Sequence, residues 1–319
     1  MKIHQIFTIS IISFVLLFII SIHFKIEPRS QIILDIPSGS SATTISTYLD
    51  ENKIILSPML FKIYAKFSFA DKKFKAGEYK IESPHSIYDL SKKITSGDFY
   101  YRKLTLLPGF KVSDILKLGD SKYLINDLKK NPYEVMKSYG IEMQEGIFFA
   151  DTYYYLKGES FSSVLIKSNK KWIKFSQEIW NKRTSNLPFK NLIEATTLAS
   201  IIEKEGVEKR KIASVFVNRL KKNMRLQSDP TVIYALGNEF DGNLTRQDLR
   251  IDHPYNTYRY KGLPPGPISI VSQESLEAAL NPLSTEYFYF VSMGNGFHKF
   301  SKTLPEHNEA VLKYQINAR

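Results

Sequence analysis

The sequence predicts an α+β protein with an N-terminal transmembrane helix, a small α+β module and a larger α+β domain. Three observations lead to this prediction: an apolar run at the N-terminus, a mixture of strand-like and helical patterns over the next roughly 70 residues, and long amphipathic helices in the second half of the chain. The predicted boundaries are 1–28 for the anchor, 29–100 for the module and 101–319 for the larger domain. With 319 residues the chain is long enough for two domains and an anchor.

The predicted anchor is a run without a formally charged side chain that extends from Gln5 to Phe24. About 20 apolar residues span a bilayer. No cleavage site of the small-x-small type follows within Ser21–Lys25, so we expect an uncleaved anchor and not a signal peptide. Lys2 and the terminal amine favour a cytoplasmic N-terminus, although Lys25 and Arg29 partly offset them.

The module is predicted from strand-like and helical patterns that follow one another closely. Ser57 before Pro58 is a typical helix start, because serine caps the helix and proline suits its first turn. Gly97 marks the expected end of the last helix. The expected elements, in order, are a strand over 31–36, a helix through Ile45, Tyr48 and Leu49, a helix from Pro58, a strand over 74–81 and a short helix through Ile87, Leu90 and Ile94.

The larger domain is predicted from longer amphipathic helices joined by polar or proline-rich loops. Asp229 precedes a proline, which disfavours helical backbone, so we expect Asp229 to lie outside the next helix. The lysine-rich stretch that ends at Tyr139 gives no clear pattern, and the prolines of 262–267 predict a rigid loop. The expected elements are strands over 100–107 and 287–292, a hairpin turn over 294–296, and helices over 112–118, 161–180, 192–205, 208–223, 231–236, 272–280 and 303–313.

An acid and a threonine lie inside an aromatic cluster between Glu145 and Tyr155. Aromatic faces with a few polar groups suit a sugar-binding cleft, because sugars present apolar CH faces and hydroxyl edges. Three tyrosines in a strand are equally typical of an ordinary core. The sequence leaves both interpretations open.

Composition excludes several kinds of chemistry. The chain contains no cysteine, which rules out disulfides, thiolate zinc sites and thiol nucleophiles. The formal charge of +12 suits an anionic surface, but the lysines are scattered and no nucleic-acid-binding motif accompanies them. His253, His298 and His307 show no metal-ligand spacing, so we expect them to be structural and expect neither a metal nor another cofactor.

The strongest candidate for chemistry is Glu205, at the end of the helix expected over 192–205. Apolar residues fall at helical spacing along this helix, and Glu205 continues their stripe because it lies four residues after Ile201. Glu203 lies about 200° away round the helix and meets different surroundings. We therefore expect Glu205 to be partly desolvated, with a pKa nearer about 6–7 than the reference value of about 4.3. The alternative is a solvated acid that ends an amphipathic helix before Gly206.

Several blocks of the second half together resemble the endolytic murein transglycosylase family (MltG-type, YceG-like). They follow the family's order with similar gaps from about Glu145 to the C-terminus, and the ordered set is far more specific than any one block. The module is similar to the LysM-like subdomain of that family through 36–39 and 74–79. The matching blocks are 199–205, 213–220, 224–234, 255–258, 262–267, 275–282 and 306–308.

The resemblance implies a single-pass enzyme of the cell inner membrane, with a LysM-like module and an α+β catalytic domain, built around a central catalytic helix, on the periplasmic side. Its substrate would be peptidoglycan glycan strands, which it would cut between N-acetylmuramic acid and N-acetylglucosamine to leave 1,6-anhydro ends and terminate elongation. Peptidoglycan synthases are the implied partners. The family's catalytic glutamate maps onto Glu205. The implied substrate-binding residues are Gln227, Asp229, Tyr255, Asn256 and Tyr258.

The chain departs from the family pattern at four places, one of which is the strand before Pro108, where the usual acid is lacking. Ala150 stands where the family usually has proline, Gly206 where alanine or threonine is common, and Met293 where aspartate is frequent. These departures leave the local loop geometry open.

Lytic cleavage needs only one carboxyl group, because the 6-hydroxyl of the substrate takes the place of water. Glu205 is expected to protonate the glycosidic oxygen and then to remove the proton from that hydroxyl. Two rival functions stay open. One is a glycoside hydrolase that uses Asp229 or Asp151 as a second carboxylate. The other is a non-catalytic anchor that binds peptidoglycan and recruits synthases.

Overall fold

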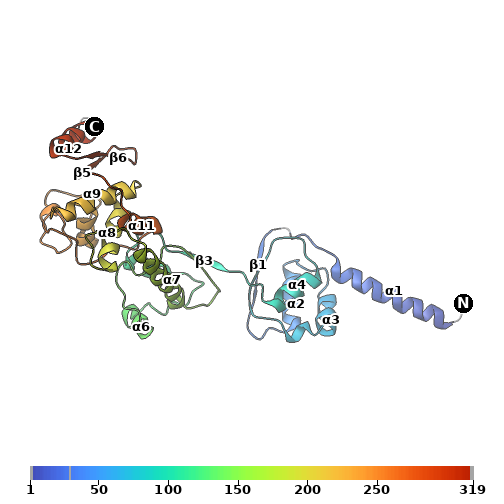
Figure 1. The fold of residues 1–319 in the computed structure, drawn as a ribbon. Coiled ribbons are helices and arrows are strands. Elements are labelled where there is room, and N and C mark those ends of the chain that lie inside the picture. The colour runs from blue at the N-terminus through green and yellow to red at the C-terminus, as the bar shows by residue number, and fades with distance from the viewer. Residues whose placement is uncertain (1–2, 29, 317–319) are drawn as a thin grey trace. The chain divides into compact units, whose positions relative to one another are not determined.

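The computed structural model describes residues 3–28 and 30–316 (Figure 1). The chain forms two compact units. The first unit runs to Lys103 and also takes in Tyr154–Glu159, whereas the second comprises Leu104–Tyr153 and the chain from Ser160 onwards. Both units contain helices and strands, so the predicted α+β class is confirmed.

The first unit is built on an antiparallel pair of strands, β1 (Ile32–Ile36) and β2 (Gly77–Ile81). Leu34 and Tyr79 enter one core with the inner faces of the surrounding helices. The predicted caps are present: the Ser57 hydroxyl accepts a 3.3 Å hydrogen bond from the Leu60 N–H, and Gly97 ends its helix in the left-handed conformation. The helices are α1 (Ile3–His23), α2 (Ala42–Glu51), α3 (Pro58–Phe67) and α4 (Ile87–Ser96).

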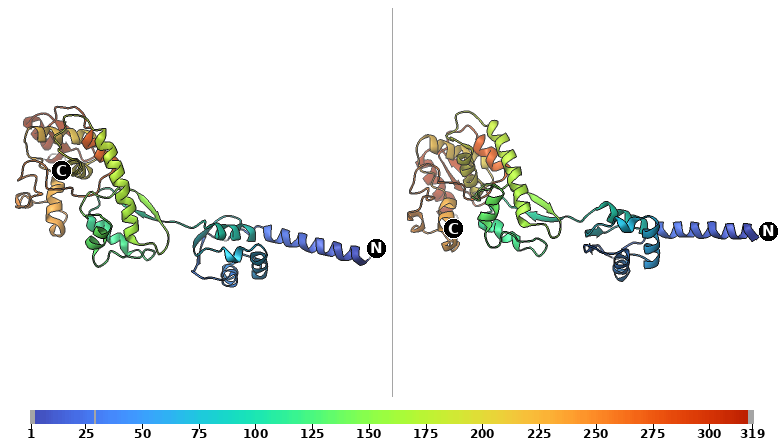
Figure 2. Two further views of the ribbon diagram at one scale, coloured as in Figure 1. Left: turned by 60° about the horizontal axis from the view of Figure 1, so that its bottom comes forward. Right: turned by 90° about the horizontal axis from the view of Figure 1, so that it is seen from below.

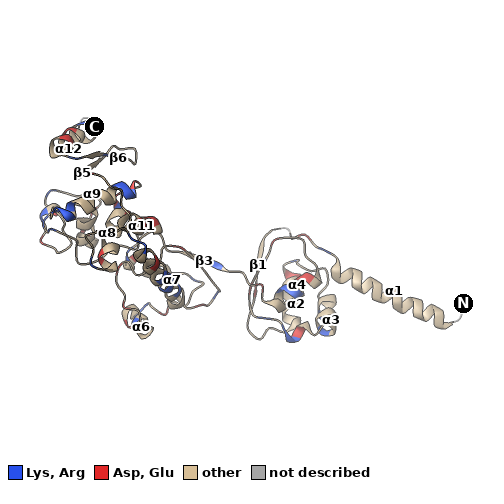
Figure 3. Cartoon of the chain, in the orientation of Figure 1, with Lys and Arg blue, Asp and Glu red and all other residues tan. Residues whose placement is uncertain are grey.

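Helix α1 is the candidate membrane anchor. It is 21 residues long and is the only helix among the described residues that is long and apolar enough to cross a membrane. Figure 2 shows it as one unbroken helix that ends at the body of the first unit. In Figure 3 it carries no Lys, Arg, Asp or Glu, whereas charged residues are distributed over the helices and loops of both units. The sequence prediction of a long apolar helix is confirmed.

The core of the second unit surrounds α8 (Leu192–Glu205), which packs against four other helices. Leu198, Ile201 and Ile202 on α8 have no exposed surface. The helices that contact α8 are α7 (Phe161–Asn181), α9 (Lys209–Lys221), α10 (Asp229–Leu236) and α11 (Gln273–Leu280). The N-terminal part of this unit contributes α5 (Val112–Lys117) and α6 (Pro132–Ser138), and β3 (Arg102–Thr105) pairs with β4 (Thr152–Tyr155) where the chain passes between the units.

The C-terminal segment is a hairpin followed by a helix, drawn in red in Figure 1. Strands β5 (Tyr289–Ser292) and β6 (His298–Ser301) are antiparallel. Helix α12 (Leu304–Val311) packs against both strands and continues as a π-helical turn over Leu312–Ile316. The hairpin and α12 form one wall of the site described below.

The structure differs from the sequence prediction at three places. Strand β2 begins at Gly77 and not at residue 74, because its partner β1 ends at Ile36, which pairs with Gly77. Helix α6 lies in the lysine-rich stretch that shows no clear pattern in the sequence. Helix α10 includes Asp229 as its first residue, since Pro230 is compatible with the first helical turn.

The aromatic cluster between Glu145 and Tyr155 is mainly core. Phe148 and Tyr155 are buried, and the buried Tyr153 hydroxyl donates a 2.7 Å hydrogen bond to the Phe149 carbonyl. Of the two interpretations that the sequence left open, the structure therefore favours the core for most of these rings.

Candidate active site

The candidate site lies at the C-terminal end of α8. Asn191 caps the N-terminus of this helix, since its side-chain oxygen accepts a 2.9 Å hydrogen bond from the Glu194 N–H. The helix ends at Glu205. Gly206 follows with extended backbone at φ 162°, which any residue can adopt. A Cβ atom at Gly206 would lie 2.6 Å from Cε1 of His298, so the ring of His298 fills the space that a larger residue would need. This contact is a physical reason for the glycine at this position.

Glu205 is a partly buried acid held by one strong hydrogen bond. The Ser228 hydroxyl donates to Glu205 Oε1 at 2.5 Å. Burial raises the pKa of Glu205 to about 7; the Ser228 bond and the positive charge of Arg219 act against this rise, and the negative charge of Asp229 adds to it. A carboxyl group with this pKa retains its proton in a large fraction of molecules at neutral pH, as an acid catalyst requires.

Glu203, two residues earlier, has the opposite environment. Its carboxylate pairs with the Lys209 ammonium at 2.9 Å and accepts hydrogen bonds from the Ser272 N–H and hydroxyl at 2.8 and 2.6 Å. Burial alone would raise its pKa, but the hydrogen bonds from Ser272, Ser275 and Lys209 outweigh burial and lower the pKa. Glu203 is thus an ionised residue that ties α8 to the start of α11. Glu203 and Glu205 thus have different surroundings, as expected, and their pKa values move in opposite directions.

Arg219 on α9 supplies a buried positive charge next to Glu205. Its side chain is only 6% exposed. Nε donates to the Phe288 carbonyl at 2.6 Å and Nη1 donates to the Leu226 carbonyl at 2.6 Å, while the guanidinium lies 5.3 Å from the centre of the Tyr289 ring. Two carbonyl acceptors hold the cation in place without neutralising it, so its charge remains available to an ionised Glu205.

The loop before α10 is held by Thr257. Its carbonyl accepts a 3.1 Å hydrogen bond from the Gln227 N–H, and its hydroxyl accepts a 3.0 Å bond from the Ser228 N–H. Gln227 has φ 49°, in the left-handed region that non-glycine residues seldom adopt. Such strained backbone persists where the surrounding contacts fix it, and here it aims the Ser228 hydroxyl at Glu205.

Asp229 and Tyr258 form a second polar pair beside Glu205. The Tyr258 hydroxyl donates to Asp229 Oδ1 at 2.5 Å. Burial and the negative charges of Asp229 and Glu205 raise the pKa of Tyr258, so its hydroxyl stays protonated. Both side chains line the cavity at Glu205 and can offer a hydroxyl and a carboxylate to a sugar.

These residues surround a cavity of about 740 Å³. One wall comes from the end of α8 and the start of α10, with Glu205, Gln227 and Asp229. The opposite wall comes from the C-terminal hairpin and α12, with Tyr289, His298 and His307 among its residues. The volume is in the range of pockets that take small ligands or parts of larger ones, and the lining mixes aromatic and polar groups, as carbohydrate recognition needs.

Two residues expected in the cleft lie outside this cavity. The Asn256 side chain is fully buried; it donates to the Ile251 carbonyl at 2.8 Å and accepts a 3.0 Å hydrogen bond from the Tyr258 N–H. Tyr255 packs its ring against Tyr234 at 4.8 Å. Neither side chain lines the cavity at Glu205, so Asn256 acts by fixing the loop that carries Tyr258 and Tyr255 acts by supporting α10.

Several functional candidates are absent from the sequence prediction. Ser228 and Arg219 lie inside the blocks quoted for the family resemblance, but no residue pattern distinguishes them from their neighbours. His298 and His307 were expected to be structural, and the structure places both in the cavity wall. The Nδ1 atom of His307 is buried without a hydrogen-bond partner, and Nδ1 of His298 lies 3.5 Å from the Glu208 carboxylate. Among the described residues no cluster of three or more potential ligands could hold a metal ion.

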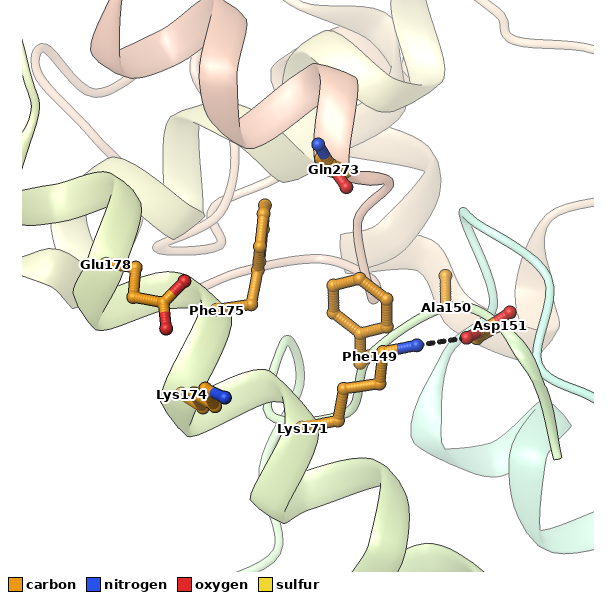
Figure 4. Close-up of a pocket in the computed structure, with 8 residues that line it drawn as sticks. All are labelled: Phe149, Ala150, Asp151, Lys171, Lys174, Phe175, Glu178 and Gln273. Atoms are coloured by element: carbon orange, nitrogen blue, oxygen red, sulfur yellow. Dashed lines mark hydrogen bonds and ion pairs between the residues drawn. The ribbon is translucent and has the colours of Figure 1, made fainter.

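Asp151, the other candidate for a second carboxylate, lies in a different cavity (Figure 4). This cavity, of about 590 Å³, is lined by the segment at Phe149, by α7 and by Gln273. Asp151 is engaged there in an ion pair with Lys171. A hydrolytic pair of Glu205 and Asp151 therefore does not fit the structure, whereas Asp229 shares a cavity with Glu205.

Comparisons with known proteins agree with one another. The model of the YceG-like family matches residues 34–313. The endolytic murein transglycosylase of Bacillus subtilis (strain 168) is 36% identical over an alignment of 318 residues, and the match covers 90% of this chain and 86% of the relative. The protein of the same name from Streptococcus pneumoniae serotype 2 is 26% identical over 91% of this chain, which spans only 59% of that relative's length. The 2.6 Å crystal structure of a yceG-like protein from Listeria monocytogenes is 34% identical, with a TM-score of 0.50, and the match covers 88% of this chain and 99% of that one.

Proposed function

The chain belongs to the YceG-like family, and on this premise we propose that it is a lytic transglycosylase of peptidoglycan. It cleaves the β-1,4 bond between N-acetylmuramic acid and N-acetylglucosamine inside glycan strands and leaves 1,6-anhydro-muramyl ends. One observation carries the proposal: Glu205 is a partly buried acid with a pKa of about 7 that faces a cavity suited to sugars.

The proposed reaction uses Glu205 twice. As an acid it gives its proton to the glycosidic oxygen while the bond from C1 of the muramyl residue to that oxygen breaks. The resulting carboxylate then removes the proton of the muramyl 6-hydroxyl, whose oxygen forms a bond to C1 and closes the anhydro ring. Glu205 ends the cycle protonated, and no water is consumed, so one carboxyl group is enough.

Ser228 and Arg219 would support the two states of Glu205. The Ser228 hydroxyl fixes one carboxyl oxygen and so leaves the other oxygen to face the substrate. The positive charge of Arg219 favours the carboxylate that exists after the first proton transfer. The same acid can thus be protonated before bond cleavage and ionised after it.

Three of the predicted binding residues remain candidates for direct contact. Gln227 and Asp229 are both exposed and line the cavity beside Glu205, and Tyr258 orients Asp229. We propose that these three groups bind sugar hydroxyl and acetamido groups. Asn256 and Tyr255 support them from behind.

The products test the reaction most simply. We expect purified full-length protein in detergent or vesicles to convert long glycan strands into fragments with 1,6-anhydro ends. Mass spectrometry detects such a fragment because its mass is lower by one water than that of the same fragment with a reducing end. Reducing ends would instead support a hydrolase in which Asp229 acts as the second carboxylate. Complete inactivity of wild-type protein on glycan strands would favour the non-catalytic scaffold.

The variant Ser228→Ala tests whether the Ser228 hydroxyl lowers the pKa of Glu205. Because the Ser228 hydrogen bond lowers the pKa of Glu205, its removal should raise that pKa above the wild-type value of about 7. The alkaline limb of kcat/KM, along which activity falls as Glu205 loses its proton, should then move to higher pH. We expect kcat at its own optimum to fall by about 10-fold, since one orienting hydrogen bond of roughly 1.5 kcal/mol is lost.

The matched control for this experiment is Ser214→Ala. Its hydroxyl donates a 2.6 Å hydrogen bond to the Lys211 carbonyl within α9 and does not line the cavity. Ser214→Ala should therefore leave the pH dependence of kcat/KM unchanged. An unshifted limb in Ser228→Ala would contradict the proposed role of Ser228.

We further propose that α1 is an uncleaved anchor in the cell membrane and that both folded units face the cell wall. The core of the first unit contains Ile22, which belongs to α1, so the end of the helix is part of the folded unit. This supports retention of the helix in the mature protein. Peptidoglycan synthases, whose product is the substrate, are the proposed partners, and the first unit is the proposed LysM-like module.

A further inference from the structure

Helix α1 and the body of the first unit are joined without a flexible linker. Ile22 is only 6% exposed and belongs to the core of the unit, and Phe18 packs against that core. The ring of His23 lies 4.9 Å from the ring of Tyr88. Just after the helix, Ile26 and His85 exchange two backbone hydrogen bonds of 2.8 and 3.0 Å. One face of the last turn and a half of α1 therefore packs against the folded unit, while Ile19 and Ile20 stay exposed.

The free part of α1 is too short to cross a bilayer alone. The apolar stretch is bounded by the charged Lys2 in the sequence, and between Lys2 and the contact with the unit lie Ile3–Leu17, a length of about 22 Å at about 1.5 Å per residue. The hydrocarbon layer is about 30 Å thick, and tilting the helix would increase the deficit. To reach about 20 residues the membrane-spanning stretch must extend to about Ile22. The part of the first unit that packs against Phe18–Ile22 must then lie at the boundary of the bilayer.

The surface at that depth is apolar. A groove of about 250 Å³ lies beside the end of α1. Leu56 and Met59, at the start of α3, are 68% and 67% exposed, and Phe24 is 56% exposed. The groove is lined by Ile20, Ser21, Phe24, Ile26, Leu56, Leu60 and Ile87. Exposed apolar side chains of this size, grouped at the base of a membrane helix, are disfavoured in water and favoured at the edge of the hydrocarbon layer.

Two lysines next to this surface have the sign that lipid headgroups attract, although the acidic Glu27 also lies close by, directly after the groove residue Ile26. Lys25 directly follows Phe24 and is exposed, and Lys53, three residues before Leu56, is exposed as well. Lysine side chains near the end of a membrane helix reach the phosphate groups while their stems stay in the apolar layer.

We propose that the groove beside α1, which Phe24 and Leu56 line, is embedded in the bilayer boundary together with Met59, the sequence neighbour of the groove residue Leu60, and that lipid acyl chains fill the groove. The first unit would then be held at a fixed height and orientation on the membrane, and not suspended above it on a tether. This inference requires only that α1 is an anchor and does not depend on the chemistry of Glu205.

The absence of cysteine allows a direct test with the full-length chain. Single variants Leu56→Cys and Met59→Cys would carry a nitroxide label, in vesicles of phosphatidylcholine and phosphatidylglycerol. Both sites are exposed, so the label should not disturb the core. The measured quantity is the ratio of label collisions with oxygen, which concentrates in the apolar layer, to collisions with a water-soluble nickel complex. We expect this ratio to be about 3-fold or more higher at these two sites than at a water-exposed site.

Two control sites lie on the same unit. Ser38 is exposed at the β1 end that pairs with Gly77, away from the Ile26–His85 contact with the anchor end of the unit. Phe67 is an exposed apolar residue beside Ser41 and Thr43, at the start of α2. Labels at Ser38→Cys and Phe67→Cys should behave as water-exposed, and the second shows that apolar character alone is not the cause.

The outcome decides between the bilayer and other occupants. Labels at Leu56 and Met59 that are as accessible to nickel as the label at Ser38 in lipid-only vesicles would overturn the proposal. Protection that arises only when a membrane protein is added to the vesicles would also overturn it, because the occupant would then be a protein partner. As a second measurement, Leu56→Asp combined with Met59→Asp should move a label at Phe24→Cys toward the aqueous phase.

Discussion

Glu205→Gln is expected to lower the rate of glycan cleavage by at least about 10²–10⁴-fold, because an amide can neither donate the proton nor take it back. The amide oxygen can still accept the hydrogen bond from Ser228, so the geometry at the end of α8 should persist. The rate of formation of anhydro ends by wild-type and variant protein, under identical conditions, measures the effect.

The stability of Glu205→Gln provides an independent check. The pKa of Glu205 in the folded protein, about 7, lies above its ordinary value of 4.5, so folding favours the protonated form. The stability that this preference contributes is complete below about pH 4.5 and is lost as the pH rises through about 7. Glutamine does not ionise, so the variant should unfold at the same temperature as wild type at pH 4.5 and at a higher temperature at pH 8.

Glu203→Gln is the matched control on the same helix. It weakens the pair with Lys209 and should lower the melting temperature, yet leave cleavage within a few-fold of wild type. If Glu205→Gln released glycan at the normal rate, Glu205 would have no part in the chemistry. If Glu203→Gln alone abolished cleavage, the roles of the two acids would have to be exchanged.

Arg219→Met is expected to have the largest effect on stability. Methionine has a similar length but donates no hydrogen bond, so the Phe288 and Leu226 carbonyls lose their donors. Leaving these buried groups unsatisfied costs about 2–4 kcal/mol in total. For a protein of this size that corresponds to a fall in melting temperature of roughly 5–15 °C.

Arg219→Met should also move the pH profile. The positive charge of Arg219 lowers the pKa of Glu205, so its removal should raise that pKa and shift the alkaline limb of kcat/KM to higher pH. Arg225→Met is the control, because Arg225 is exposed and donates one hydrogen bond, to the Arg259 carbonyl at 3.1 Å. A melting temperature of Arg219→Met equal to that of Arg225→Met would contradict the structural role of Arg219.

The burial of Glu205 could be predicted from the sequence because it depends on the residues of its own helix. The 3.6-residue period of α8 places Glu205 below Ile201 and Leu198, both without exposed surface, and Glu203 on another face. The same reasoning predicted the caps at Ser57 and Gly97, which depend on neighbours three or four residues away.

The rest of the site depends on contacts between distant segments, which no local pattern encodes. Ser228 meets Glu205 across 23 positions, and Arg219 is held by a carbonyl 69 positions away at Phe288. His298 reaches Gly206 only because the C-terminal hairpin folds back against α9 and the end of α8. Asn256 lies in a block of the resemblance, yet nothing local shows that its amide is used entirely within its own loop.

Titration of the Glu205 carboxyl carbon by ¹³C NMR shows whether this acid carries a proton near neutral pH. Glu145 is also expected to titrate near pH 7, since burial raises its pKa to about 7, so the Glu205 signal is identified by subtracting the spectrum of Glu205→Gln. The structure predicts a midpoint of about 7 for Glu205. A midpoint near the ordinary value of 4.5 would exclude Glu205 as the acid catalyst, because the acid would then be ionised before the substrate bond could be protonated.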